Sequence, residues 1–223
     1  MRFDARRFAM TRLLAALAVA VVLCAHTHAQ APLRPLRIVL MVDATEGVRQ
    51  SIGMIRKALA GFVQDIDARH EMMLVTVAGT PQIRVRPTAD RAQILKSVNG
   101  IFGTTGSNVM QRLIDDLFHR FAQPAERTPI FVVVTAEGFE STQNVNPQEI
   151  THVASHFIDS GGTLHAIRLI VPAGASTFRG GNLTDLPVSL MIAREASGIY
   201  TNISPNGLND VLQRLSTVIN EAP

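Results

Sequence analysis

Short apolar runs alternate along the chain with longer segments in which apolar residues recur every three or four positions. A short run that is mostly apolar is typical of a strand buried on both faces, whereas the longer spacing predicts an amphipathic helix. The runs predict strands over residues 36–42, 72–77, 130–134, 164–171 and 199–203. The periodic segments predict helices over residues 52–66, 90–98, 109–121, 147–159, 188–197 and 208–219.

This order of elements predicts one doubly wound α/β domain over residues 36–220, with a mostly parallel, Rossmann-like sheet and helices on both faces. A polar-edged run at 82–85 predicts one antiparallel strand at the edge of the sheet. Residues 172–187 are rich in Gly, Pro, Ser and Thr without periodicity, which predicts a long surface loop. Ser204 and Pro205 predict the cap of the last helix.

Residues 1–29 have the layout of a signal peptide. Arginines precede an apolar run over residues 13–23, and the small residues Thr27 and Ala29 follow it. We expect cleavage after Ala29, a short linker over residues 30–35, and a secreted or periplasmic protein. The apolar run is shorter than the roughly 20 residues that a membrane span needs, so no stable span is expected after cleavage. An uncleaved anchor is the alternative.

The net charge of +3 arises in this leader. Four of the 21 Lys and Arg residues and one of the 18 Asp and Glu residues lie there, so the mature chain carries equal numbers of both signs. Nucleic acids and anionic membranes bind to a clustered excess of basic side chains, so we expect no nucleic acid partner. The one cysteine, Cys24, is also in the leader. The mature domain therefore has no disulfide and no cysteine metal ligand.

Three polar loops lie where ligands bind in open α/β sheets. Residues 43–47 (DATEG) follow the first strand, 106–109 (GSNV) open a helix, and 135–138 (TAEG) follow the most hydrophobic strand. In this order they resemble the D-x-S-x-S, G-T-N-L and T-D-G segments of von Willebrand factor A domains. Residues 193–200 are similar to that family's A-x-x-T-G-G-x-Y segment, and the resemblance covers about residues 36–220.

The resemblance implies a metal-ion-dependent adhesion site, and it assigns Asp43, Thr45 and Ser107 to that site. A magnesium ion needs about six oxygen ligands in an octahedral arrangement. The same residue types have a structural interpretation, because Asp43 and Thr45 can cap the turn into the first long helix and Ser107 is typical of a helix start.

Two departures from the family pattern remove oxygens from this site. Gly47 stands where the family has its second serine, and Ala136 stands where it has the aspartate of T-D-G. Glu46 and Glu137 are the carboxylates close enough in sequence to compensate. We therefore expect a degenerate site and no cofactor, with weak binding of Mg²⁺ or Ca²⁺ as the alternative.

The resemblance implies an interaction module that binds a protein or peptide partner through the strand-end loops and catalyses no reaction. Phe102, Phe139 and Glu140 are the candidate contact residues on that face. The alternative within the same family is a divalent-cation-dependent adhesion domain that uses the remaining site oxygens.

An enzymatic alternative is a haloacid dehalogenase-like phosphotransferase with Asp43 as its nucleophile. Asp43, Thr45 and Thr135 match the strand-end residues of that family. It also needs a lysine near the phosphate, but neither Lys57 nor Lys96 falls in a strand-end loop. We therefore expect no enzymatic activity.

His152 and His156 are four residues apart on a predicted helix, which is the spacing of a zinc-binding pair. The apolar face of that helix predicts that both rings face solvent instead. Asp115 and Asp116 are likewise expected on the solvated flanks of their helix rather than in a metal site.

Overall fold

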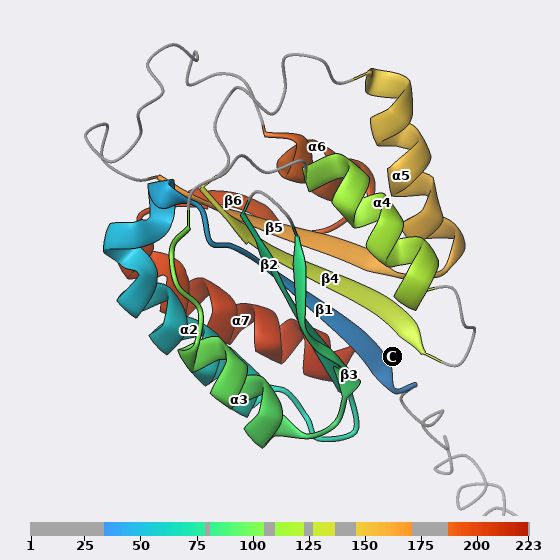
Figure 1. The fold of residues 1–223 in the computed structure, drawn as a ribbon. Coiled ribbons are helices and arrows are strands. Elements are labelled where there is room, and N and C mark those ends of the chain that lie inside the picture. Colours follow the sequence, from blue (N-terminus) through green and yellow to red (C-terminus); the bar gives the residue numbers. More distant parts are fainter. Residues whose placement is uncertain are drawn as a thin grey trace, which may run out of the picture. The chain divides into compact units, whose positions relative to one another are not determined.

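The computed structural model describes residues 34–78, 81–104, 110–122, 127–136, 146–170 and 187–222. They form a six-stranded sheet in the order β3-β2-β1-β4-β5-β6 (Figure 1). The strands are β1 (Leu36–Asp43), β2 (Glu71–Val77), β3 (Gln82–Thr88), β4 (Thr128–Thr135), β5 (Thr163–Leu169) and β6 (Tyr200–Ile203). All pairings are parallel except that of β3 with β2. The mostly parallel fold class and its antiparallel edge strand are confirmed.

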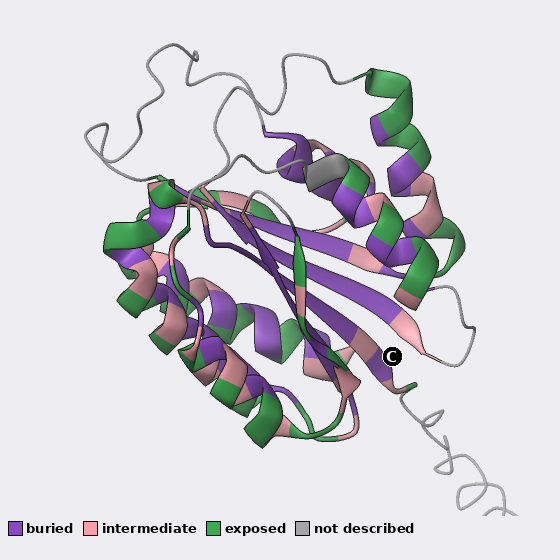
Figure 2. Ribbon diagram, viewed as in Figure 1, coloured by how far each residue is buried: buried purple, intermediate pink, exposed green. Residues whose placement is uncertain are grey.

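Helices cover both faces of the sheet. They are α2 (Ile52–Asp65), α3 (Arg91–Asn99), α4 (Met110–Phe121), α5 (Pro147–Asp159), α6 (Val188–Glu195) and α7 (Leu208–Glu221). α2, α3 and α7 pack on one face, and α4, α5 and α6 pack on the other (Figure 1). In β1, Ile38 and Leu40 enter the first core, whereas Val39 and Met41 enter the second. Both faces of the strand are therefore buried, which explains why it is apolar at every position from 38 to 42 (Figure 2).

The winding of the sheet reverses between β1 and β4. β1 pairs with β2 on one side and with β4 on the other. The register places Val42 opposite Val134, so Asp43 and Thr135 end neighbouring strands side by side. This is the predicted arrangement, and the carboxyl ends of strands at such a reversal are where open α/β sheets bind ligands.

Short 3-10 turns precede two of the helices. η1 (Glu46–Ser51) comes before α2, and η3 (Pro205–Gly207) comes before α7. The prediction that Ser204 caps the last helix is therefore wrong, because this serine precedes η3 and its side chain makes no capping hydrogen bond. Proline lacks the amide hydrogen and favours the first position of a turn, which fits the 3-10 start. The surface loop predicted over residues 172–187 falls almost wholly outside the described residues.

The edge strands of the sheet differ from its central strands. β3 exposes Arg84 and Arg86 and contains Pro87. β6 has four residues, which alternate between exposed and partly buried. The sheet thus ends on a basic, proline-containing strand at one edge and on a very short strand at the other.

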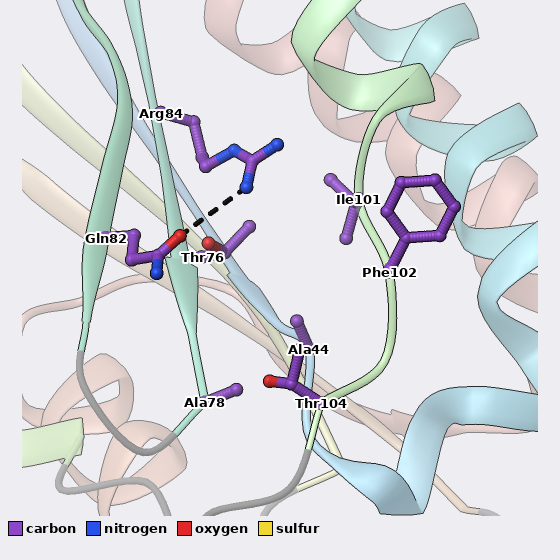
Figure 3. Close-up of a pocket in the computed structure, with 8 residues that line it drawn as sticks. All are labelled: Ala44, Thr76, Ala78, Gln82, Arg84, Ile101, Phe102 and Thr104. Atoms are coloured by element: carbon purple, nitrogen blue, oxygen red, sulfur yellow. Dashed lines mark hydrogen bonds between the residues drawn. The ribbon is translucent and has the colours of Figure 1, made fainter.

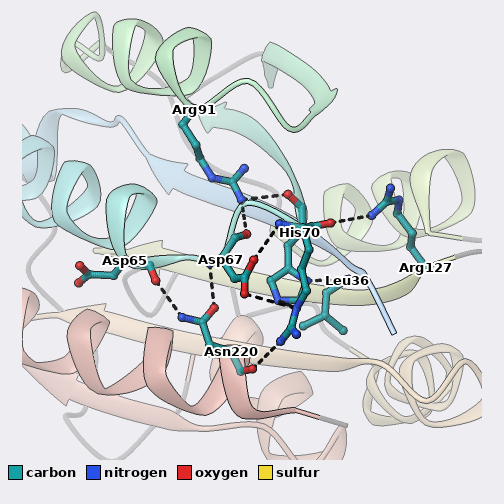
Figure 4. A network of polar contacts seen from close by, with 8 residues as sticks. Leu36, Asp65, Asp67, His70, Arg91, Arg127 and Asn220 are labelled. Carbon is teal, nitrogen blue, oxygen red and sulfur yellow. Dashed lines mark hydrogen bonds and ion pairs between the residues drawn. The ribbon is translucent and has the colours of Figure 1, made fainter. Parts of the chain in front are cut away.

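A polar network fastens the turn between α2 and β2 at the end of the sheet where β1 begins (Figure 4). The buried ring of His70 accepts a hydrogen bond at Nδ1 from the backbone N–H of Leu36, at 2.9 Å. Arg91 donates to the carbonyl oxygens of Asp67 and His70 at 2.8 and 2.9 Å. Burial lowers the pKa of His70 to about 4, and the charge of Arg69 acts in the same direction. The ring is therefore neutral at pH 7 and free to accept the amide hydrogen.

The turn after α6 approaches β5 very closely. A Cβ atom at Gly198 would collide with the carbonyl oxygen of Leu164. The adjacent backbone N–H of Ile199 donates to Nδ1 of His165 at 3.0 Å. Burial lowers the pKa of His165 to about 4, so this ring is also a neutral acceptor.

Candidate functional site

Asp43 organises the carboxyl ends of β1 and β4. It is the last residue of β1, and 1% of its surface is exposed. Its Oδ1 accepts a hydrogen bond from the backbone N–H of Thr45 at 2.8 Å. Its Oδ2 accepts from the hydroxyl of Thr135 at 3.1 Å and from the backbone N–H of Ala136 at 2.9 Å. Three donors from two loops thus stabilise a buried carboxylate.

A third segment, residues 101–104, lies against the loop after β1. The backbone N–H of Thr104 donates to the carbonyl oxygen of Ala44 at 2.7 Å, and Thr104 forms a parallel bridge with Thr45. This segment follows α3, and its contacts with Ala44 and Thr45 place it beside the end of β1. The loop after β1 and the segment after α3, which the sequence predicts to share a site, therefore meet. Ser107, Glu137, Phe139 and Glu140 lie outside the described residues.

Gly47 lies close to both Thr45 and Ala136. A Cβ atom added at Gly47 would lie 3.8 Å from the Thr45 hydroxyl and 3.9 Å from the Cβ of Ala136. Glu46 turns to the surface instead, where its carboxylate pairs with Arg49 at 2.9 Å. Among the described side chains here, the Thr135 hydroxyl meets the Asp43 carboxylate, and the Thr45 hydroxyl lies near position 47.

An open pocket lies beside this site, between the ends of β2 and β3 and the 101–104 segment (Figure 3). Thr76, Gln82 and Arg84 line its strand side. Arg84 donates to the side-chain oxygen of Gln82 at 3.5 Å and to the carbonyl oxygen of Gly100 at 3.1 Å. The pocket therefore offers hydroxyl, amide and guanidinium groups to a ligand.

Phe102 is an exposed aromatic residue at the rim of this pocket. It is 66% exposed, and the guanidinium carbon of Arg56 lies 4.6 Å from the centre of its ring. The Arg56 side chain also donates to the carbonyl oxygen of Ile101, with Nε at 2.7 Å. These contacts anchor the backbone beside an apolar side chain that remains open to solvent. The sequence predicts Phe102 as a contact residue. It does not predict the role of Arg56, because the contact between Arg56 and Phe102 joins residues far apart in the chain.

The histidines of α5 differ from the prediction. The side chain of His156 is 21% exposed, and its ring stacks on Phe118 of α4 with 5.4 Å between ring centres. The expectation that both rings face solvent is wrong for His156, because α4 packs against that flank of α5. Burial lowers the pKa of His156, and the charges of His152 and His119 act in the same direction. Asp115, expected on a solvated flank, lies against the same ring.

No protein-family model and no curated protein sequence matches the chain. Solved structures match its fold. The conserved hypothetical protein BatB from Bacteroides thetaiotaomicron is 13% identical, with a TM-score of 0.61 over 83% of this chain and 98% of BatB. A von Willebrand factor type A structure from Catenulispora acidiphila is 13% identical, with a TM-score of 0.63 over 82% of this chain and 42% of that chain.

A third match is the von Willebrand factor domain of the type V pili tip protein Mfa5 from Porphyromonas gingivalis. It is 10% identical, with a TM-score of 0.59 over 85% of this chain and 96% of that domain. The protein therefore has the fold of a von Willebrand factor A domain. The resemblance carried by the strand-end loops is confirmed at the level of the fold.

Proposed function

We propose that this protein is an interaction module that binds a protein or peptide partner through the strand-end face and needs no divalent cation to do so. The fold supports the proposal, since domains of this kind occur in proteins such as a pilus tip protein. At Gly47 and Ala136 the chain lacks the oxygens with which the family binds its ion. Binding is therefore expected to rest on direct contacts with side chains.

The exposed ring of Phe102 is the observation that carries this proposal. Aromatic side chains that remain open on a rigid backbone dominate the binding energy of many interfaces. Phe102 combines such a ring with the polar groups of the adjoining pocket. An apolar anchor beside hydrogen-bonding groups suits a peptide segment with one apolar side chain and a polar backbone.

The surroundings of Asp43 disfavour the alternative of a phosphotransferase with this residue as its nucleophile. A nucleophilic carboxylate must reach the phosphorus atom of its substrate. The Asp43 carboxylate is buried, and the hydrogen bonds from Thr45, Thr135 and Ala136 engage both of its oxygens. Lys57 and Lys96 lie within α2 and α3, away from the strand ends.

We also propose that the protein is exported and that its mature chain starts at Gln30, on the strength of the signal-peptide pattern. Among the described residues, none of the helices combines the length and the apolar character that a membrane crossing requires. N-terminal sequencing of the exported protein tests this proposal. A protein retained in the membrane with an intact Met1 would contradict it.

The interaction is tested by affinity capture from the envelope fraction of the source cells, with and without chelator. Phe102→Ala is compared with Tyr200→Ala, which removes another exposed aromatic ring from the strand at the far edge of the sheet. We expect one partner to be retained by the wild type and by Tyr200→Ala, with or without chelator. For Phe102→Ala we expect a loss of affinity of about tenfold or more. Equal capture by both variants, or capture abolished by chelator, would overturn the proposal.

A further inference from the structure

Four metal-ligating side chains gather where α4 packs against α5, on the face of the sheet that these helices cover. Asp115 and His119 are one helical turn apart on α4, and His152 and His156 are one turn apart on α5. The ring centres of His119 and His156 lie 4.8 Å apart, and those of His152 and His156 lie 4.6 Å apart. The rings of His119 on α4 and His156 on α5 therefore meet between the two helices.

Two polar atoms at the centre of this cluster lack a hydrogen-bond partner. Oδ1 of Asp115 and Nε2 of His156 are shielded from solvent, and neither has a partner among the described residues. They are 3.6 Å apart, which is too long for a hydrogen bond. Nδ1 of His119 lies 3.4 Å from the same Asp115 oxygen. Packing has thus brought the Asp115 oxygen and the His156 nitrogen together without a hydrogen bond to either of them.

We propose that Asp115, His119 and His156 bind one zinc ion between α4 and α5, with His152 beside them as a fourth candidate ligand. One ligand atom from each of the three residues lies within 4.8 Å of the others. Ligands at about 2.1 Å from a tetrahedral zinc ion are about 3.4 Å apart, close to the observed separation of Asp115 and His156. His119 has a side chain that is 43% exposed, so its ring can turn to complete the site.

The ligand chemistry favours zinc over the ions expected in the strand-end site. Imidazole nitrogens with one carboxylate suit zinc and neighbouring transition metals, whereas Mg²⁺ and Ca²⁺ prefer oxygen ligands alone. Nδ1 of His119 also contacts the carbonyl oxygen of Asp115 at 2.9 Å, a backbone contact of the kind that orients metal-binding imidazoles, so Nε2 is the nitrogen with which His119 would bind the ion. A bound ion would link α4 to α5, two helices that β4 separates along the chain.

The test is calorimetric titration of ZnCl₂ into the full chain, purified without a polyhistidine tag. Because Cys24, His26 and His28 in the leader are also potential zinc ligands, all measurements use a background in which these are Ser, Gln and Gln. We expect one equivalent of zinc to bind with micromolar or tighter affinity, and MgCl₂ to give no signal at the same concentration. The absence of saturable zinc binding in this background would overturn the proposal.

Variants locate the site. Loss of a group that only hydrogen-bonds a metal ligand weakens metal sites about 10- to 100-fold, so removing a ligand by His156→Gln or His119→Gln should weaken zinc binding at least tenfold. Asp116→Asn is the matched control, because its carboxylate pairs with Arg120 on the exposed flank of the same helix. Melting curves without zinc establish that each variant folds, and His119→Gln replaces a side chain that is 43% exposed, so it disturbs packing little. Unchanged affinity in the His119 and His156 variants would place the zinc elsewhere and contradict the proposal.

Discussion

The hydroxyl of Thr135 donates a hydrogen bond to Oδ2 of Asp43 at 3.1 Å, although 92 positions of sequence separate the two residues. This bond joins the ends of β1 and β4 where the winding of the sheet reverses. The same carboxylate also holds the backbone of both following loops. Asp43 therefore shapes the strand-end face whether or not an ion binds there.

Asp43→Ala is expected to destabilise the fold by about 2–4 kcal/mol, because it leaves buried donors from Thr45, Thr135 and Ala136 without their acceptor. Asp43→Asn keeps an acceptor oxygen and should cost less. Urea denaturation of the two variants and the wild type measures the difference. A loss below about 0.5 kcal/mol in Asp43→Ala, the range of an ordinary surface substitution, would show that the carboxylate does not organise these loops.

Millimolar Mg²⁺ or Ca²⁺ is expected to leave the melting temperature almost unchanged, since the described site offers few oxygens. Gly47→Ser together with Ala136→Asp should create a response, because a Cβ atom at position 47 meets its neighbours at ordinary contact distances. An ion present at 100 times its dissociation constant stabilises a fold by about 2.7 kcal/mol. For a domain of this size that is a shift of roughly 5–10 °C.

Thermal melts with and without ion measure this response, with each single substitution as a control. A large shift in the unmodified protein, lost on Asp43→Ala, would contradict the prediction. It would show that the domain retains a cation site.

Acid should unfold the protein through His70 and His165. Both rings have a pKa of about 4 in the fold, below the ordinary histidine value of 6.5, so the unfolded chain binds more protons between these values. Stability therefore falls as the pH drops from about 6.5 toward 4, by up to about 1.4 kcal/mol per pH unit for each ring. Urea midpoints at several pH values measure the slope, and His165→Gln should reduce it. An unchanged slope in that variant would exclude His165 as a contributor.

Gly198→Ala is expected to cost about 3 kcal/mol or more, because the new methyl group collides with the backbone oxygen of Leu164. Gly53→Ala is the matched control, since a Cβ atom there meets no atom within 4 Å. Its position inside α2 predicts a gain of about 0.5–1 kcal/mol from reduced backbone entropy. Chemical denaturation of both variants tests the pair. Similar effects of the two substitutions would contradict the close approach of this turn to β5.

Local patterns were sufficient to predict the bounds of single elements and the meeting of two strand ends. The bounds of α5 match the prediction because Asn146 caps its start, Pro147 takes the first position, and Gly161 adopts a left-handed conformation beyond its end. β1 was predicted because its residues alternate between two apolar cores. The loops at Asp43 and Thr135 were predicted to meet because parallel strands end at the same edge of a sheet.

Contacts between neighbouring helices could not be predicted in this way. The apolar face of α5 shows which side packs on the sheet, but it does not show that α4 covers the flank that carries His156. The stacking of Arg56 on Phe102 likewise depends on how α2 is placed beside the 101–104 segment. Helical periodicity identifies one buried face, whereas these side chains occupy the boundary between faces.

The edges of the sheet restrict how this domain can associate with other chains. An open edge strand is a template for pairing with a foreign strand, and charged side chains, proline and short length each oppose such pairing. On β3 the charged side chains are Arg84 and Arg86, and the proline is Pro87. The strand β6 is short, with only four residues. Copies of the domain are thereby hindered from joining edge to edge into extended sheets at high local concentration.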